Sequence, residues 1–286
     1  MDGFIIVNKP KGMTSHDVCN ILRGVLHTKK VGHSGTLDPL ATGVLVVGVG
    51  KATKLLNYLE NHQKTYVAEA LFGIKTDSYD ILGNVLKTDD TLNITNEMID
   101  EKLLILKELK TQIPPIYSAI KVNGRKLYDY AIKGEEVEIL PRNIKIHSLE
   151  RVSDYSEKKV KIKVKADKGF YVRSLINDLG EALFTCAAMS DLTRIEAGNY
   201  DLRVSQTIEE IKENGPIIHS VEEVFGHIGR IDVNDYMRKL VVNGVVLDER
   251  QYQKDEMFRV YHNDKLIAIY EPFENHKYRL VIKMED

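Results

Sequence analysis

Segments typical of strands and of helices follow one another along the chain without the regular alternation that a doubly wound sheet requires. The apolar spacing predicts strands at residues 4–7, 44–49, 64–72, 143–152 and 159–166, and helices at residues 17–26, 52–59 and 96–106. The strands at 143–152 and 159–166 succeed each other with no helix between them. The sequence therefore predicts an α+β fold.

One strand segment is unusually basic. KKVKIKVKADK, residues 158–168, alternates lysine with Val160, Ile162, Val164 and Ala166. Because successive side chains of a strand point to opposite faces, this pattern predicts one basic face and one buried face. Two interpretations of the lysines are open: they discourage edge-to-edge pairing of the strand, or they follow the phosphates of a nucleic acid.

The chain changes character near residue 226. Beyond this point, the short alternating segments are VVNGVVL, FRVYHNDKLIAIY and YRLVIKM, around the turn signals Asn243-Gly244 and Asn263-Asp264. An acidic helical segment, IEEIKENG, precedes the region. We therefore predict a first domain over residues 1–226 and a small all-β domain over residues 227–286.

Composition limits the class of protein. The formal net charge is −2, so no overall basic character marks a nucleic-acid binder. MDGFIIVNKP begins acidic and has only four consecutive apolar residues, unlike a signal peptide, and VLVVGVG is far too short to span a membrane. Cys19 and Cys186 lack metal-ligand spacing and are expected to be reduced thiols. We expect a cytoplasmic protein without membrane contact.

The loop GHSGTLDPLATG, residues 32–43, holds three glycines, a proline and one carboxylate, Asp38. A phosphate-binding P-loop is excluded, since the neighbouring GVGKAT has Leu45 and Ala52 where the motif needs a glycine and a hydroxyl. Asp38 followed by Pro39 suits a helix N-cap, although only one turn of helix fits before the next strand. The loop alone leaves the role of Asp38 open.

Two other kinds of site find little support. His16, His27 and His33 have no H-x-x-x-H pairing and no cysteine pair beside them, so no metal site is predicted. A glycosidase-like pair of carboxylates needs a second acid opposite Asp38, and the sequence cannot place one. A lone carboxylate acting on a glycosidic bond suits a reaction that keeps water out.

The loop closely resembles the active-site loop of the bacterial TruB-type tRNA pseudouridine synthases. Further segments in the family's order extend the resemblance over residues 3–200: NKPKGMTSHD, KTYVAEALFGIKTDSYDILG, PPIYSAIKVNGRKLYDYA, DKGFYVRSLINDLG and DLTRIEAGNY. The closing module is similar to a short PUA-type RNA-binding domain. The resemblance implies a pseudouridine synthase fold, with a mixed, mainly antiparallel central sheet flanked by helices and an RNA-gripping insertion at about residues 113–140.

The resemblance also implies a reaction: isomerisation of the T-loop uridine of tRNA, position 55, after the base is flipped into a pocket. Asp38 matches the essential aspartate, which acts at the ribose as nucleophile or as base. Arg173 matches the arginine that pairs with this aspartate. Tyr66 matches the tyrosine that stacks on the target base and is placed for proton transfer at C5. No cofactor and no metal are implied.

Other matched positions are implied to bind the RNA or to support the loop. His33 matches the histidine that takes the space vacated by the flipped nucleotide, and Leu192 matches an apolar wall of the pocket. Tyr171 lies beside the catalytic arginine, and Arg194 remains of a pair of arginines common in the family. Lys9 matches a residue that supports the loop, whose glycines are expected to let the backbone approach the flipped nucleotide closely.

The implied partner is the T-arm of tRNA, with no obligate protein partner, and we expect a monomer. Two alternatives stay open. A guide-RNA-dependent pseudouridylase of the related dyskerin branch would lack the long insertion that residues 114–137 supply here. A non-catalytic chaperone would use the same fold to fold tRNA without modifying it.

Overall fold

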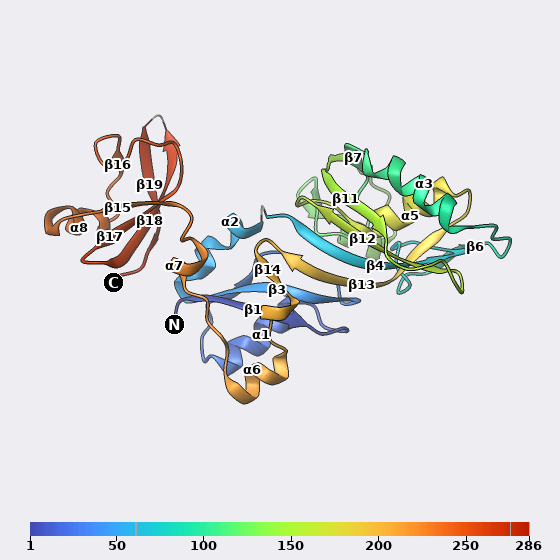
Figure 1. Ribbon diagram of the computed structural model, residues 1–286, viewed down its shortest axis with the longest axis horizontal. Helices are drawn as coiled ribbons and strands as arrows, with labels where there is room; N and C mark the ends of the chain where they lie inside the picture. Colours follow the sequence, from blue (N-terminus) through green and yellow to red (C-terminus); the bar gives the residue numbers. More distant parts are fainter. Residues whose placement is uncertain (61, 275, 286) are drawn as a thin grey trace.

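The computed structural model describes residues 1–60, 62–274 and 276–285. A sheet of eight strands forms the body of the molecule (Figure 1). Its strands are β1 (Gly3–Lys9), β2 (Val31–His33), β3 (Ala41–Val49), β4 (Lys64–Phe72), β11 (Ile146–Arg151), β12 (Lys159–Ala166), β13 (Ala187–Ala197) and β14 (Tyr200–Asp201). Among their described pairings, β13 and β3 run parallel and the others antiparallel. The sheet is therefore mixed and mainly antiparallel, as the resemblance implied.

The strand order explains how distant segments come together. Along the sheet it is β1-β3-β13-β4-β12-β11, with β2 beside β3 and β14 beside β13. Strand β13 comes late in the chain, yet it lies between β3 and β4 and joins the two halves of the sheet. The loop that follows β2, the start of β4 and the middle of β13 consequently meet near the centre of the molecule (Figure 1).

Helices pack against the sheet through separate clusters of buried apolar residues. The helices and 3-10 turns of the first 226 residues outside residues 113–140 are α1 (Ser15–Val25), η1 (Gly50–Leu55), α2 (Leu56–Glu60), α3 (Asn96–Lys107), α5 (Val172–Ala182), η2 (Leu202–Val204), α6 (Ile208–Asn214) and α7 (Val221–Val224). Helix α1 begins after Thr14, whose side chain accepts the backbone N–H of Asp17 in a reciprocal capping box. Val18 and Leu22 of α1 and Ile208 of α6 pack against β1 and β3. Helices α3 and α5 cover the other half of the sheet.

The basic strand predicted at residues 159–166 is β12, with the predicted bounds. Val160, Ile162, Val164 and Ala166 are buried in the core beneath α3 and α5, so the buried face is confirmed. The lysines point to the opposite face. The strand lies between β4 and β11, so its lysines protect no free edge, and that interpretation is wrong.

Residues 113–141 are bracketed by a short ladder between β7 (Thr111–Gln112) and β10 (Arg142–Asn143). Between these strands lie β8 (Lys121–Val122), β9 (Arg125–Lys126) and α4 (Leu127–Lys133). The segment therefore leaves the body and returns to it at one place. Its α4 ends at Gly134 with a φ of 63°, a left-handed conformation that glycine adopts without a steric penalty.

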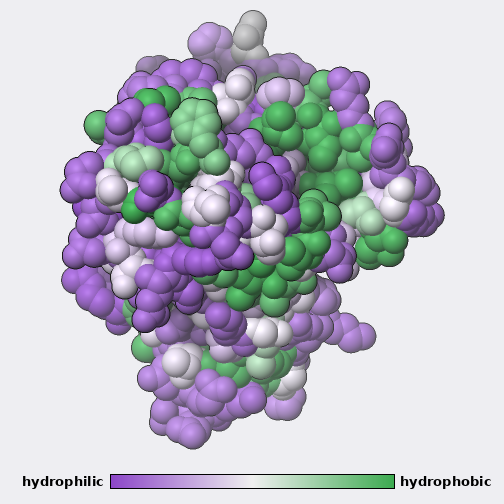
Figure 2. Space-filling model, turned by 90° about the vertical axis from the view of Figure 1, so that its right-hand side faces the viewer, coloured by the Kyte–Doolittle hydropathy of each residue, from purple (hydrophilic) through white to green (hydrophobic). Residues whose placement is uncertain are grey.

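A hairpin of β5 (Ile74–Thr76) and β6 (Val85–Thr88) projects from the end of the body that also carries α3. All four residues of β6 are exposed. Figure 2 looks onto this end and shows hydrophobic residues gathered among hydrophilic ones. The exposed apolar residues of this end include Val85, Leu86, Leu104 and Ile105.

The C-terminal domain is a five-stranded sheet in the order β15-β17-β18-β19-β16. Its elements are β15 (Gly229–Asp232), α8 (Asp235–Val242), β16 (Leu247–Asp248), β17 (Phe258–His262), β18 (Lys265–Glu274) and β19 (Lys277–Lys283). The strands predicted around Asn263-Asp264 and at YRLVIKM are confirmed. The strand predicted for VVNGVVL is wrong except at Leu247, which begins β16. Val241 and Val242 close the amphipathic helix α8, because Asn234 caps that helix and Val241 fills the core beneath it.

The two domains share a core. Ile269 of β18 and Ile282 of β19 are buried in the same apolar cluster as Phe4, Val44 and Leu55. Across this interface the hydroxyl of Tyr58 donates to Glu271 Oε2 at 2.6 Å. Shared burial of this kind fixes one domain on the other.

Candidate active site

The loop that carries Asp38 is held from below by α1. The Ser15 hydroxyl at the start of that helix accepts the Leu37 N–H at 2.8 Å and donates to the Leu37 carbonyl at 3.2 Å. Pro39 and Leu40 then form a turn, and no helix follows Asp38. The helix-cap interpretation is therefore wrong. The Asp38 side chain keeps 37% of its surface exposed and faces a cavity.

The structure shows why one of the loop's three glycines, Gly43, must be a glycine. Its φ is +102°, and a Cβ there would lie 2.2 Å from the carbonyl oxygen of Arg194 in β13. Only glycine fits this close approach between β3 and β13. The backbone at Gly43 therefore approaches the chain's own strand, and the expected approach to a nucleotide is wrong for this residue. A Cβ at Gly35 would meet only ordinary van der Waals contacts.

Arg173 is the buried partner of Asp38. Its Nη2 lies 2.9 Å from Asp38 Oδ2, and its side chain is 7% exposed. The same nitrogen donates to the Tyr117 carbonyl at 3.0 Å, while Nη1 donates to the Ser78 carbonyl at 3.2 Å. Asp80, itself buried, lies 3.7 Å from Nη1. These contacts fix both ends of the planar guanidinium, so Arg173 orients the Asp38 carboxylate.

The position of Arg173 follows from the start of α5. The side-chain amide of Gln112 donates to the Tyr171 carbonyl at 3.1 Å and accepts the Tyr171 N–H at 2.9 Å. The Ser174 hydroxyl donates to the Ile113 carbonyl at 2.8 Å. The first turn of α5 is thus tied to the base of the segment at residues 113–141.

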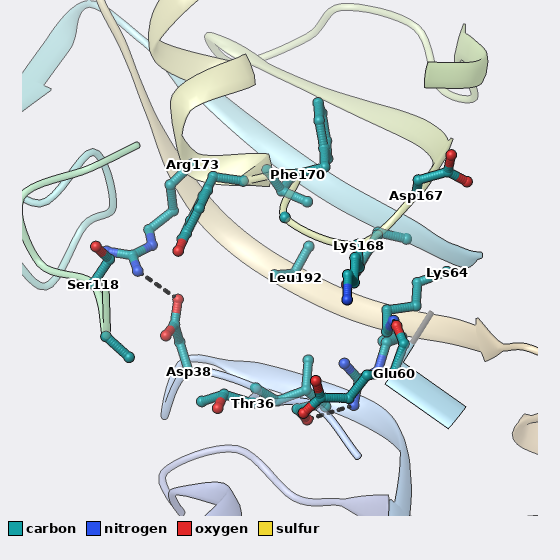
Figure 3. A pocket seen from close by; sticks show the side chains of 18 of the residues that line it. Thr36, Asp38, Glu60, Lys64, Ser118, Asp167, Lys168, Phe170, Arg173 and Leu192 are labelled. Atoms are coloured by element: carbon teal, nitrogen blue, oxygen red, sulfur yellow. Dashed lines mark hydrogen bonds and ion pairs between the residues drawn. The ribbon is translucent and has the colours of Figure 1, made fainter. Parts of the chain in front are cut away.

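The cavity beside Asp38 has a volume of about 320 Å³, within the ~300–1,000 Å³ usual for binding sites of small groups. Figure 3 shows Asp38 and Arg173 at one end of it, Leu192 at its wall, and Lys64 and Lys168 toward the other end. Six of the eight residues predicted for the site line it: Asp38, Tyr66, Tyr171, Arg173, Leu192 and Arg194. Burial raises the pKa of Tyr171, so its hydroxyl stays protonated at neutral pH.

The strand register brings three of these residues onto one face. Tyr66 of β4 is paired with Arg194 of β13 on one side and with Val164 of β12 on the other. Leu192 is paired with Ala68, two residues further along β4. Paired residues point to the same face of a sheet, so Tyr66, Leu192 and Arg194 share the face that bears the cavity.

Lys9 and His33 are not among the residues that line the cavity. Lys9 is fully buried, and its Nζ donates to the carbonyls of Pro10 at 2.9 Å and Met13 at 2.6 Å. Burial lowers its pKa to about 8, against an opposing effect of Asp38. His33 ends β2, and its Nδ1 accepts the Gly35 N–H at 3.4 Å. Burial lowers the pKa of His33 as well, so its ring is neutral at pH 7.

Arg194 proves to be a structural clamp on the loop. It is 2% exposed, and its guanidinium donates to the carbonyls of Val44 at 2.7 Å and Gly35 at 3.2 Å. One of these carbonyls lies before Asp38 in the chain and the other after it. A buried cation bonded to two carbonyls in this way holds the loop between them.

Several lining residues escaped the sequence prediction, among them Lys64, Phe170 and Lys168. So did Asp80, which lies behind Arg173 and does not line the cavity. The signal for Lys64 was present. It precedes Tyr66 by two residues, so the two side chains share a face of β4. Its Nζ donates to the carbonyls of Glu60 at 2.7 Å and His62 at 2.9 Å. Burial, helped by Arg194, lowers its pKa to about 8.

The site offers a carboxylate held by a buried arginine, an aromatic ring on the neighbouring wall, and cations at the far end. Within the described ranges no three His, Cys, Asp or Glu side chains are grouped to hold a metal ion. Cys19 and Cys186 are both free and buried. In the same part of the chain, none of the helices has the length and apolar character needed to cross a membrane.

Two solved structures share the architecture of this chain. The chain matches one of a Cbf5-Nop10-Gar1 complex with a TM-score of 0.68 at 24% identity, over 99% of this chain and 84% of that one. It matches a chain of an H/ACA RNP bound to a substrate RNA containing 2'-deoxyuridine with a TM-score of 0.66 at 22% identity, over 98% and 84%. At these identities the likeness establishes the fold.

The sequence comparisons define the family. The model of the TruB family pseudouridylate synthase (N terminal domain) matches residues 23–172. The chain is 40% identical to tRNA pseudouridine synthase B of Caldanaerobacter subterraneus over 92% of both chains. It is also 40% identical to tRNA pseudouridine synthase B of Clostridium tetani, over 94% of this chain and 95% of that one. The protein belongs to the TruB family of pseudouridylate synthases.

Proposed function

We propose that the protein converts the T-loop uridine at position 55 of a tRNA to pseudouridine. One observation carries the proposal: Asp38 and Arg173 form an ion pair at the end of a cavity that Tyr66 and Leu192 also line. The relatives at 40% identity bear the name of a tRNA-modifying enzyme, which supports tRNA as the substrate. The position within the tRNA comes from the resemblance of the loop.

In the proposed reaction the target base leaves its stack and enters the cavity. Tyr66 stacks on the base, an interaction worth ~1–3 kcal/mol. Asp38 acts at the ribose, as nucleophile or base, while the N1–C1′ bond breaks. The base then turns, and C1′ forms a bond to C5. Tyr66 is proposed to take part in removing the proton from C5. N1 gains a proton in the same reaction, so the protons balance.

Arg173 keeps the Asp38 carboxylate aimed at the ribose throughout, because its other donors are fixed by backbone carbonyls. We propose that Tyr171 and Leu192 form the apolar walls around the base. Lys9 and Arg194 support the loop from behind, in agreement with their buried contacts to carbonyls.

His33 is proposed to fill the space that the flipped nucleotide leaves. Its place outside the lining of the cavity agrees with a role beside the RNA stack, where a neutral ring is suited to stacking. We further propose that residues 113–140 grip the RNA, that residues 1–226 form the catalytic domain and that residues 227–286 form a PUA-like RNA-binding domain. The protein acts as a cytoplasmic monomer without a cofactor or an obligate partner.

The test uses purified protein and an unmodified tRNA transcript, with pseudouridine mapped by chemical modification and reverse transcription. The wild-type protein is expected to modify one T-loop uridine without any added protein or guide RNA. Asp38→Asn is expected to lower the single-turnover rate by at least about 10³-fold, the order seen when a group acting directly on the substrate is lost. Asp154→Asn, at an exposed carboxylate beyond β11, is the matched control and should keep full activity.

Different results separate the alternatives. Activity that survives Asp38→Asn would contradict the proposed mechanism. Activity that appears only with added guide RNA and partner proteins would identify the guide-dependent class. A wild-type protein that promotes tRNA folding but forms no pseudouridine would be a chaperone, while folding activity that persists in Asp38→Asn would show both roles in one chain.

A further inference from the structure

A second cavity, of about 640 Å³, begins where the active-site cavity ends. Asp167 and Lys168, in the loop between β12 and α5, line both. Figure 3 shows these two residues at the end of the active-site cavity away from Arg173. The other walls of the groove are formed by His62, Gln63, Lys165, Glu196, Gly198, Asn199 and His227. His227 follows α7 in the link between the domains, so the groove leads from the active site toward the C-terminal domain.

The fixed charges of the groove cancel, since two lysines and two carboxylates line it. The carboxylates are already engaged: Asp167 Oδ1 lies 2.7 Å from His147 Nε2, and Glu196 Oε2 accepts the Thr65 hydroxyl at 2.6 Å. Lys165 and Lys168 have no ion pair among the residues that the structure describes. The lysines are consequently available to bind an anion, while the carboxylates are already hydrogen-bonded to protein side chains.

The two imidazoles are the remaining titratable groups of the groove. His62 is half-buried and packs over Gly198, where a Cβ would lie 2.4 Å from His62 Nδ1. The His62 ring therefore occupies space that a side chain at position 198 would fill. His227 is exposed, and its ring stacks on Phe225 at a centroid distance of 6.3 Å. One imidazole lies just before β4 and the other lies in the link between the domains.

We propose that this groove binds backbone phosphates of the substrate RNA next to the target nucleotide, with His62 and His227 as phosphate ligands that become protonated on binding. The inference rests on the proposed function, because only a strand that enters the active-site cavity passes directly into the groove. Phosphate is the anion that a nucleic-acid strand presents at every nucleotide, and lysine and imidazolium are suited to it.

The direction of the pH dependence follows from the charges around the rings. Burial, followed by Lys64 and His227, lowers the pKa of His62, so this ring is neutral in the free protein at pH 7. The other charged and titratable groups near the rings are those of the groove, those beside His62, and one histidine behind Asp167: Lys165, Asp167, Lys168, Glu196, Arg194, Tyr200 and His147. A bound phosphate raises the pKa of a neighbouring imidazole. Binding therefore takes up protons, and affinity rises as the pH falls.

The experiment measures the dissociation constant of an isolated T-arm stem-loop RNA between pH 5.5 and pH 8 at constant ionic strength. Binding is measured in the Asp38→Asn background, so that no turnover occurs. Affinity is expected to increase by about two- to fivefold for each imidazole over this range. At low pH the slope of log affinity against log salt should steepen by about 0.7 for each further phosphate that the protein neutralises. His62→Gln and His227→Gln should each remove part of this dependence, and the double variant nearly all of it.

His27→Gln, at an exposed imidazole outside the groove, is the matched control and should behave like the parent. His227 is exposed, so its variant tests the proposal even if His62→Gln folds poorly. A parent affinity that does not change with pH would overturn the proposal, as would the same pH dependence in the double variant. A dependence seen with full-length tRNA but not with the stem-loop would also overturn it. The wild-type modification assay reports separately on the proposed function.

Discussion

The cations of the active site and those of the C-terminal domain are held in opposite ways. Around the cavity, the buried Lys9, Lys64 and Arg194 bond to backbone carbonyls. In the C-terminal domain, arginines on the surface pair with neighbouring carboxylates. These pairs are Arg230 with Asp232 and Asp264, Arg238 with Glu285, Arg250 with Asp248, and Arg279 with Glu271.

A carbonyl orients a cation without cancelling its charge, whereas a carboxylate cancels it. The charges of Lys9, Lys64 and Arg194 are therefore not cancelled by a bonded carboxylate, whereas those of the paired surface arginines of the C-terminal domain are. Exposed pairs contribute only ~0–1 kcal/mol to stability, while buried charges are costly unless they are fully bonded. Arg173 combines the two arrangements, because it contacts carbonyls and carboxylates together.

The largest effect is expected at Arg173. Arg173→Met removes the ion-pair partner of Asp38, so pseudouridine formation should be lost. It also leaves the buried Asp80 without a nearby cation, so the free energy of unfolding should fall by about 3–5 kcal/mol. Arg279→Met, at a surface pair, should cost less than about 1 kcal/mol. Urea denaturation and single-turnover assays measure both. Equal destabilisation by the two variants would show that burial of the cation is energetically unimportant.

Arg173→Lys separates charge from geometry. Lysine keeps the charge but cannot reach both carbonyls and Asp38 with a planar fork. The rate is expected to fall by about 10²-fold with a smaller loss of stability than in Arg173→Met, as for an orienting group. A rate equal to that of the wild-type protein would contradict the role of the fork in orienting Asp38.

The next effect concerns Lys64. Its pKa, lowered by burial to about 8, predicts that the ammonium loses its charge as the pH rises through 8. Its attraction for RNA is then present below pH 8 and lost above it. Lys64→Met is expected to weaken T-arm binding by about tenfold at pH 7 and to have little effect at pH 9.5. Titration of fluorescent RNA at both pH values measures this. An equal loss at pH 9.5 would contradict the low pKa.

Salt dependence distinguishes Lys168, in the loop after β12, from Lys163 on the lysine face of that strand. Lys168 lies at the active-site cavity, whereas Lys163 points to the face opposite Tyr66 and lies 3.9 Å from Glu150. Affinity for tRNA should fall steeply with salt, and Lys168→Gln should reduce the slope by about 0.7, the loss of one phosphate contact. Lys163→Gln should leave the slope unchanged. A reduced slope in Lys163→Gln would extend phosphate binding along the lysine face beyond Lys165, which lines the groove described above.

The smallest effect is expected at Asp178 of α5, which lies outside the site. Burial raises its pKa to about 6, above the unfolded value of 3.8. The cost of its charge is therefore fully present above pH 6 and absent below about pH 4. Asp178→Asn should stabilise the protein by about 1–2 kcal/mol at pH 7 and by almost nothing at pH 4. Urea denaturation at the two pH values tests this, and a gain that persists at pH 4 would contradict it.

Local pattern was enough for much of the fold. Strand β12 has the predicted bounds, because alternating lysines and β-branched residues permit one face to be buried and one to be solvated. Helix α1 and its Thr14 cap follow equally from nearby residues. VVNGVVL was misassigned because a helix and a strand are both compatible with so short an apolar run. The capping Asn234 and the core around Val241 decided between them.

The sequence determined which residues could do chemistry, since the loop around Asp38 and the segments around Tyr66 and Arg173 carry the family pattern. Only the tertiary structure decided how they act together. Because β13 lies between β3 and β4, Arg194 lies beneath the loop. The close approach of β13 to β3 also explains why residue 43 must be a glycine. The physical reason is that burial and contact between distant segments depend on strand order. Local sequence patterns do not encode that order.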